Sequence, residues 1–123
     1  MECISTQKAP QAIGPYSQAI VVNGMVYTSG QIALTPEGEM LEAEIVLQTK
    51  QVLKNLEAVL QASGSEMNKV VKCTIFLSSM DDFATVNTLY EAAFGAHKPV
   101  RSTVAVKTLP KNALVEIDAI ALI

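Results

Sequence analysis

The spacing of apolar residues changes along the chain, and these changes limit the folds that it can adopt. From about residue 43 to 63, apolar side chains recur on one helical face, with lysine, glutamate and glutamine residues on the other. A second helical stripe runs to about residue 94 from the candidate N-caps Ser79 and Asp81. The remaining apolar segments alternate as strands do. Because two helices can cover only one side of a sheet, we predict an α+β fold, with a mixed β-sheet and two helices packed on one face.

The strands are predicted from the alternating segments and the turns between them. Residues 18–23 and 25–29 flank the dipeptide Asn23-Gly24, which is a strong hairpin signal. Three further strands are predicted over residues 69–77, 100–106 and 113–123. The order of elements is therefore strand-strand-helix-strand-helix-strand-strand.

The last two strands are predicted to pair with each other through the connection over residues 109–112. The register that keeps the apolar positions together sets Thr103 opposite Glu116 and Arg101 opposite Asp118. Arginine, hydroxyl and carboxylate groups would then crowd one patch of the sheet, with apolar neighbours on the same face.

The composition indicates a single domain over residues 1–123 that joins other subunits. Half of the residues are hydrophobic, and the mean hydropathy is +0.30, so we expect the uncovered face of the sheet to be buried against another subunit. No apolar run approaches the ~18 residues of a membrane span, and the N-terminus lacks the basic-then-apolar pattern of a secretory signal. We therefore expect a cytoplasmic protein with no membrane partner.

Charge and the rare residue types exclude several kinds of site. A net charge of −3, scattered basic residues and the absence of tryptophan argue against nucleic acid as a partner. Cys3 lies in an N-terminus that we expect to be loose and Cys73 in an apolar strand, which indicates neither a disulfide framework nor a metal site. His97 is the only histidine, which excludes clusters of metal-binding histidines and two-histidine acid–base chemistry.

The strand after Pro99 contains the strongest candidate for chemistry. Alternation places Arg101 and Thr103 on one face of this strand. A guanidinium in line with a small hydroxyl group can bind a carboxylate through two parallel hydrogen bonds. The alternative is that Arg101 is a surface residue at a strand end and that Glu116 and Asp118 are only its ion-pair partners.

Asn87 lies on the apolar stripe of the second helix, one turn from Phe83 and from Tyr90. Because a buried amide needs hydrogen-bond partners, Asn87 should either tie down a nearby loop or line a pocket. We favour the loop.

Four motifs resemble one protein family. They are Ala-Ile-Gly-Pro-Tyr-Ser-Gln-Ala over residues 12–19, Ser-Gly-Gln-Ile over 29–32, Lys-Pro-Val-Arg-Ser-Thr-Val over 98–104 and Val-Glu-Ile-Asp-Ala-Ile-Ala over 115–121. In this order, and over nearly the whole chain, the set is similar to the RidA/YjgF/YER057c/UK114 family. The resemblance implies a chorismate-mutase-like homotrimer whose sheets line a central barrel. It also implies clefts between subunits that hydrolyse reactive enamines and imines of 2-amino acids.

The resemblance further implies a role for individual residues. Arg101 would bind the substrate carboxylate, and Glu116 would orient and partly deprotonate the attacking water. The implied substrate-binding residues also include Thr103 and four others. Tyr16 would close the cleft, and Asn87 would support its wall. Ser29 and the Gly30 N–H would border the substrate. Thr103 stands where many members have cysteine, which excludes regulation through a thiol at that position.

Such a reaction requires no metal and no cofactor, because an imine carbon is already electrophilic, and most of the acceleration can come from positioning. The implied substrates are small 2-imino acids such as 2-iminobutanoate and 2-iminopropanoate, and the products are 2-keto acids and ammonia.

The alternative is a non-catalytic protein that uses the same cleft to bind a small metabolite or to regulate another protein. Glu116 is the feature that favours catalysis. Ribonuclease activity, which has been attached to relatives, is disfavoured by the acidic charge and the lack of stacking aromatics.

Overall fold

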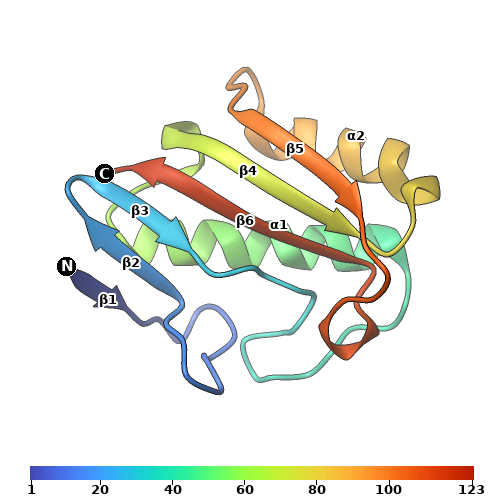
Figure 1. Cartoon of the computed structure of the whole chain (residues 1–123), viewed down its shortest axis with the longest axis horizontal. Helices are drawn as coiled ribbons and strands as arrows, with labels where there is room; N and C mark the ends of the chain where they lie inside the picture. The colour runs from blue at the N-terminus through green and yellow to red at the C-terminus, as the bar shows by residue number, and fades with distance from the viewer.

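The computed structural model describes all 123 residues and contains one six-stranded sheet (Figure 1). The strands are β1 (Glu2–Ile4), β2 (Ala19–Val22), β3 (Met25–Thr28), β4 (Val70–Leu77), β5 (Val100–Ala105) and β6 (Val115–Leu122). Their order across the sheet is β1-β2-β3-β6-β4-β5. Only β4 and β5 run parallel to each other, and every other neighbouring pair is antiparallel. The predicted mixed sheet is therefore confirmed.

Two helices pack on one face of the sheet, as predicted. They are α1 (Ile45–Ala62) and α2 (Phe83–Phe94), and both lie behind the sheet in Figure 1. Three short 3-10 turns join the elements: η1 (Met67–Lys69), η2 (Met80–Asp82) and η3 (Pro110–Asn112). The Glu44 carboxylate caps the start of α1 by accepting a hydrogen bond from the Leu47 N–H at 2.7 Å. Neither helix combines the length and the hydropathy that crossing a membrane requires.

The β2–β3 hairpin forms at the predicted dipeptide. Asn23 and Gly24 both have positive φ angles, of 51° and 73°, as a two-residue hairpin turn of this kind needs. Asparagine and glycine are the residues that adopt this conformation with the least strain. The turn sets Val22 opposite Met25, and this register continues along both strands.

The hydrophobic core fills the space between the helices and the sheet. Its helical side is the predicted stripe of α1, where Val52, Leu56, Val59 and Leu60 are fully buried. Its sheet side includes alternate residues of β6, which are Val115, Ile117, Ala119 and Ala121. Burying each valine or leucine side chain contributes about 1.5–3 kcal/mol. Because neighbouring residues of a strand point to opposite faces, the side chains between these β6 positions point away from the helices.

The face of the sheet away from the helices carries apolar side chains that remain accessible. Tyr27, Val104 and Leu122 are 46%, 45% and 48% exposed. They come from β3, β5 and β6, so the apolar surface extends across most of the sheet. An extended surface of this kind is typical of a face that packs against another subunit.

The predicted pairing of the last two strands is wrong. β6 lies between β3 and β4, and β5 pairs in parallel with the other edge of β4 (Figure 1). The observed register sets Arg101 opposite Cys73, Thr103 opposite Ile75, Glu116 opposite Phe76 and Asp118 opposite Thr74. Alternation fixes which residues of one strand share a face, but it does not fix which strand lies next to it. The segment between β5 and β6 is long enough to pass the end of β4, so the two strands need not be neighbours.

The N-terminus is also more ordered than predicted. β1 pairs with β2, with Cys3 opposite Ile20. The buried side chain of Gln18 accepts a hydrogen bond from the Thr6 N–H at 2.6 Å and donates to the carbonyl oxygens of Thr6 and Pro10 at 3.1 and 2.7 Å. A strand of three residues is too short to give a periodic signal in the sequence, which is why it was missed.

Candidate active site

The predicted site residues form two separate groups in the chain. Arg101 shares a face with Cys73 and the helices, whereas Glu116 lies on the opposite face of the sheet. The expectation that both groups face one gap within a single chain is therefore wrong. We describe the two groups as the carboxylate pocket, around Glu116, and the arginine site, around Arg101.

The carboxylate pocket is a cavity of about 570 Å³. Four predicted site residues line it, namely Tyr16, Ser29, Gly30 and Glu116. The rest of its lining comes from the loop before β2, the segment after β3, and η3. The N-terminal motif, the segment after the hairpin and the last strand thus meet at one place, although they are far apart in the sequence.

The segment after β3 is held on both sides of Gly30. The Ser29 N–H donates to the Gln18 carbonyl oxygen at 2.9 Å, and the Ser29 hydroxyl donates to the Ser17 carbonyl oxygen at 2.5 Å. Gln31 and Ile117 exchange two backbone hydrogen bonds, of 2.9 and 3.1 Å. These bonds fix Gly30 directly beside the part of β6 that carries Glu116.

The Glu116 carboxylate is in an environment that disfavours its charged form. Burial raises the pKa of Glu116 above its ordinary value, and the nearby charge of Asp118 raises it further. Burial also raises the pKa of Asp118, although hydrogen bonds from Thr74 and the charge of Lys72 oppose this rise. A carboxylate with a raised pKa takes up and releases protons closer to neutral pH, which suits general acid–base chemistry.

The arginine site holds one guanidinium against α2. Arg101 Nη1 donates to Asn87 Oδ1 at 2.8 Å. The Arg101 Cζ atom lies 4.9 Å from the ring centre of Tyr90 and 5.6 Å from that of Phe83, both within the range of cation–π attraction. These contacts set the orientation of the guanidinium while the residue stays exposed. Asn87, Tyr90 and Arg101 line a small cavity of about 170 Å³.

The preferred interpretation of Asn87 is therefore wrong. Asn87 does not tie down a loop; it lines a cavity and accepts a hydrogen bond from Arg101. The physical reason is the parallel pairing of β5 with β4, which brings the start of β5 alongside α2. The sequence pattern drew attention to this amide but could not identify its partner.

Two hydroxyl groups near Arg101 have no hydrogen-bond partner among oxygen or nitrogen atoms. They are the buried Thr103 Oγ1 and the buried Tyr90 hydroxyl. The Cys73 thiol lies beside Tyr90, and burial raises the pKa of Cys73 to about 11, so this thiol is protonated and unreactive at neutral pH. Buried polar atoms are normally paired in folded proteins, so the Thr103 hydroxyl has an unmet hydrogen bond in the single chain. It lies beneath the surface and does not line the cavity beside Arg101.

Buried amides on other elements support the carboxylate pocket, and sequence reasoning missed them. Asn55 of α1 is fully buried and donates to the carbonyl oxygens of Ile32 and Leu34, at 3.2 and 2.8 Å. Both of these residues line the pocket. The signal that drew attention to Asn87, an amide on an apolar helical stripe, was also present at Asn55.

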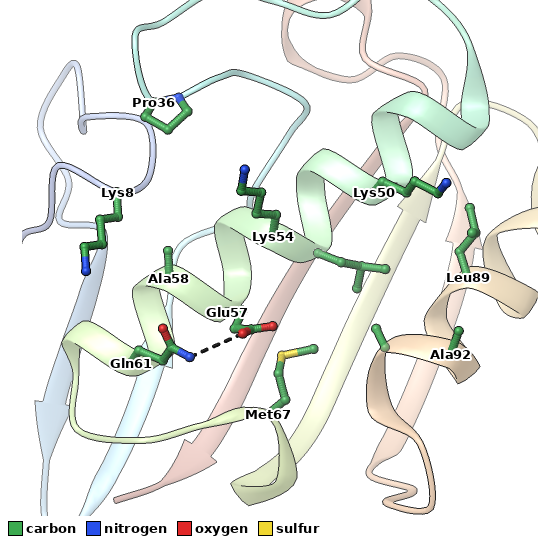
Figure 2. A pocket seen from close by; sticks show the side chains of 12 residues that line it. Lys8, Pro36, Lys50, Lys54, Glu57, Ala58, Gln61, Met67, Leu89 and Ala92 are labelled. Carbon is green, nitrogen blue, oxygen red and sulfur yellow. Dashed lines mark hydrogen bonds between the residues drawn. The ribbon is translucent and has the colours of Figure 1, made fainter.

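A larger groove of about 720 Å³ lies between α1 and α2 (Figure 2). Figure 2 shows Lys8, Lys50 and Lys54 around it, with Glu57 accepting a hydrogen bond from Gln61 Nε2 at 3.2 Å. None of the predicted site residues lines this groove. The basic side chains of this groove are lysines, and the arginine, hydroxyl and carboxylate residues of the two sites above do not line it.

Comparison with known proteins identifies several relatives that match almost the whole chain. Reactive Intermediate Deaminase A, chloroplastic, of Arabidopsis thaliana is 50% identical over 121 residues, which are 98% of this chain and 65% of that protein. The 2-iminobutanoate/2-iminopropanoate deaminase of Mus musculus is 48% identical over 119 residues, which are 96% of this chain and 88% of that protein. AldR of Lactococcus lactis, which is named as a regulator, is 47% identical over 122 residues, covering 98% of this chain and 97% of that protein.

Solved structures and a family model agree with these matches. A Thermotoga maritima protein described as an endoribonuclease has a TM-score of 0.97 and 50% identity, covering 100% of this chain and 98% of that one. Escherichia coli TdcF with bound serine has a TM-score of 0.95 and 41% identity, covering 100% and 99%. The model of the family described as Endoribonuclease L-PSP matches residues 6–123. The chain therefore belongs to this family, which is the RidA/YjgF/YER057c/UK114 family that its four motifs resemble.

Proposed function

We propose that this chain is a hydrolytic deaminase of reactive 2-enamino and 2-imino acids, such as 2-iminobutanoate and 2-iminopropanoate. It would convert them to 2-keto acids and ammonia. Two relatives that are named as deaminases, at 50% and 48% identity, support this proposal.

The observation that carries the proposal is the separation of the arginine site from the carboxylate pocket. Arg101 and Glu116 lie on opposite faces of the sheet, so one small molecule cannot contact both groups of the same chain. Each group nevertheless borders a cavity, and Asn87 holds the Arg101 guanidinium by a hydrogen bond. We propose that the chain forms the homotrimer implied by the family resemblance. In it, the arginine site of one subunit would close over the carboxylate pocket of the next.

In this arrangement, Arg101 binds the substrate carboxylate. A guanidinium can form two parallel hydrogen bonds with a carboxylate, and Asn87 and the two aromatic rings already fix its plane. The hydroxyl of Thr103 lies on the same face of β5 but is buried, so it would contact a ligand only after a local movement. The E. coli relative TdcF with bound serine supports this choice of ligand, because serine carries a carboxylate next to a carbon that bears nitrogen.

Glu116 of the adjacent subunit then orients the attacking water. The water oxygen adds to the imine carbon, one water proton passes to Glu116, and the C=N bond becomes a C–N single bond as the nitrogen takes a proton from solvent. Glu116 then returns its proton to the nitrogen. The hydroxyl group loses its proton to solvent as it becomes the carbonyl group, and the C–N bond breaks to release ammonia. The raised pKa of Glu116 makes it a stronger base for the first transfer, and a pKa closer to the working pH suits a group that must both accept and return a proton. The Gly30 N–H, Ser29 and Tyr16 border the substrate in the same pocket.

The activity can be tested by producing 2-iminobutanoate with an amino-acid oxidase and trapping it with semicarbazide. Added protein should compete with the trap, and both Arg101→Ala and Glu116→Gln should abolish this competition. The two variants are then unfolded, mixed in equal amounts and refolded together. In a trimer with shared sites, about a quarter of the sites would combine an intact Arg101 with an intact Glu116. Recovery of activity on mixing supports the shared site, and no recovery contradicts it.

The second candidate is a non-catalytic metabolite-binding or regulatory protein, which the relative named as a regulator favours. This alternative would be supported if calorimetry showed that the protein binds 2-oxobutanoate and the protein did not compete with semicarbazide for the imine. Light scattering distinguishes the assembly: a trimer is expected, and a monomer would contradict the proposed site.

A further inference from the structure

We infer that Gly30 is a positioning residue, and that its missing side chain provides the space in which the Glu116 carboxylate is held. The inference rests on the proposed function, in which Glu116 orients the attacking water. The role is distinct from that of the Gly30 N–H, which any residue except proline would also supply.

The space beside Gly30 is already occupied by Glu116. A Cβ atom placed on Gly30 would lie 2.8 Å from Cδ of Glu116 and 3.0 Å from its Cγ, and one carboxylate oxygen would be closer still. Folded proteins essentially never contain contacts this short to a Cβ atom, because atoms repel steeply inside their contact distance. An alanine at position 30 is therefore incompatible with the observed position of Glu116.

Backbone conformation does not explain this glycine. The other five glycines of the chain all have positive φ angles, in the region that favours glycine: Gly14, Gly24, Gly38, Gly64 and Gly95. Gly30 does not, so a left-handed backbone conformation is not what requires glycine there. At position 30, glycine is needed because it leaves space for the Glu116 side chain.

Glu116, and not the backbone, would have to move. Ser29 is held by two hydrogen bonds to the loop before β2, and Gln31 by two hydrogen bonds to Ile117. Because the residues on both sides of Gly30 are tied to their neighbours, the segment cannot easily retreat from β6. The flexible Glu116 side chain can rotate, which would remove its carboxylate from the place where it contacts the water.

The first test does not depend on activity. In a crystal structure of Gly30→Ala, the Glu116 carboxylate should be displaced from its observed position, with the backbone of residues 29–31 unchanged. Because the clashing atoms belong to the end of a flexible side chain, the thermal unfolding midpoint should change little. A Glu116 carboxylate that keeps its observed position in Gly30→Ala would overturn the inference.

The second test measures the imine hydrolysis. Gly30→Ala should lower kcat by about 100-fold, as expected for a catalytic group displaced by roughly 1 Å, with little change in KM because Arg101 is untouched. The matched control is Gly38→Ala. Gly38 has a φ of 90°, and no atom lies within 4 Å of the position that an added methyl group would take. This substitution should therefore lower the unfolding midpoint by backbone strain and leave kcat unchanged.

The two tests separate the inference from the proposed function. If the unchanged protein hydrolyses no imine, the proposed function fails, but the crystal structure of Gly30→Ala still decides whether Gly30 makes room for Glu116. If Gly30→Ala alone does not fold, the Gly30→Ala/Glu116→Ala variant should fold again, and its failure to do so would overturn the inference. An unchanged kcat in Gly30→Ala would overturn it as well.

Discussion

The arginine site and the carboxylate pocket are built in different ways. At the arginine site, three side chains of α2 hold one exposed side chain of β5, and the cavity is small, at about 170 Å³. In the carboxylate pocket, backbone hydrogen bonds between loops enclose about 570 Å³, and Glu116 is partly buried. The orientation of the Arg101 guanidinium therefore depends on a few side-chain contacts. The environment of Glu116 depends instead on how the loops are held, so we expect mutations at the two sites to have different signatures.

The largest effect is expected at the centre of the arginine site. Arg101→Lys keeps the positive charge but loses the two parallel hydrogen bonds and the planar stacking on Tyr90. The loss of hydrogen bonds to a charged ligand is worth about 2–3 kcal/mol, or roughly 100-fold in kcat/KM. Competition with semicarbazide measures this change. Lys107→Ala, an exposed cation beyond the end of β5, is the control and should be unaffected. A lysine variant that retains full activity would show that Arg101 acts only through its charge.

The second effect concerns the loops of the carboxylate pocket. Gln18→Leu removes three hydrogen bonds from a side chain that is 3% exposed. The backbone groups of Thr6 and Pro10 lose their partners, which should lower the free energy of unfolding by about 1–3 kcal/mol. Thermal unfolding measures the loss, and KM should also rise because the loop carries Tyr16. The exposed Gln7→Leu is the matched control. Equal stability of the two variants would mean that Gln18 does not hold the loop.

A smaller effect is expected at Asn87. Asn87→Ala removes the oxygen that accepts a hydrogen bond from Arg101 Nη1. The guanidinium keeps its charge and its aromatic neighbours but loses the one hydrogen bond that sets its orientation. The loss of one such bond is worth about 1.5 kcal/mol, or roughly a tenfold rise in KM. The exposed Thr88→Ala on the same helix is the control. A fall in kcat with an unchanged KM would place Asn87 in the chemical step and not in binding.

The smallest effect is a shift in pH dependence. The negative charge of Asp118 is one cause of the raised pKa of Glu116. Glu116 must be ionised to accept a proton from water, so kcat/KM should fall as the pH drops through this pKa. Asp118→Asn removes the like charge and lowers the pKa of Glu116, which should move the acid limb of the profile to lower pH. The exposed Asp81→Asn should leave the profile unchanged. A shift of the limb to higher pH would contradict the described electrostatics.

The local structure could be predicted from the sequence, because each element depends on residues close together in the chain. Asn23 and Gly24 determine the hairpin turn, and the stripe from Val52 to Leu60 determines the buried side of α1. The neighbours of each strand could not be predicted in this way. β5 lies beside β4 because of packing across the whole sheet, which no pattern within β5 encodes.

The candidate site shows the same division between residue type and spatial arrangement. Arg101 and Glu116 were recognised by their chemistry and their motifs, and both border cavities in the structure. Their placement on opposite faces depends on the pairing of β4 with both β5 and β6. The support from Gln18 was missed because a single amide in a loop carries no periodic signal. Asn55 does lie on an apolar helical stripe, but its partners are distant backbone atoms that no local pattern identifies.

The central position of β6 has a consequence for how the protein is made. This strand joins β1-β2-β3 to β4-β5, yet it is the last of the six strands to be synthesised. Until it emerges from the ribosome, one edge of β3 and one edge of β4 have no partner strand. Unpaired strand edges are the kind of surface on which nascent chains aggregate. The sheet can therefore close only after β6 has been made, and the interval before that is when the growing chain most needs protection.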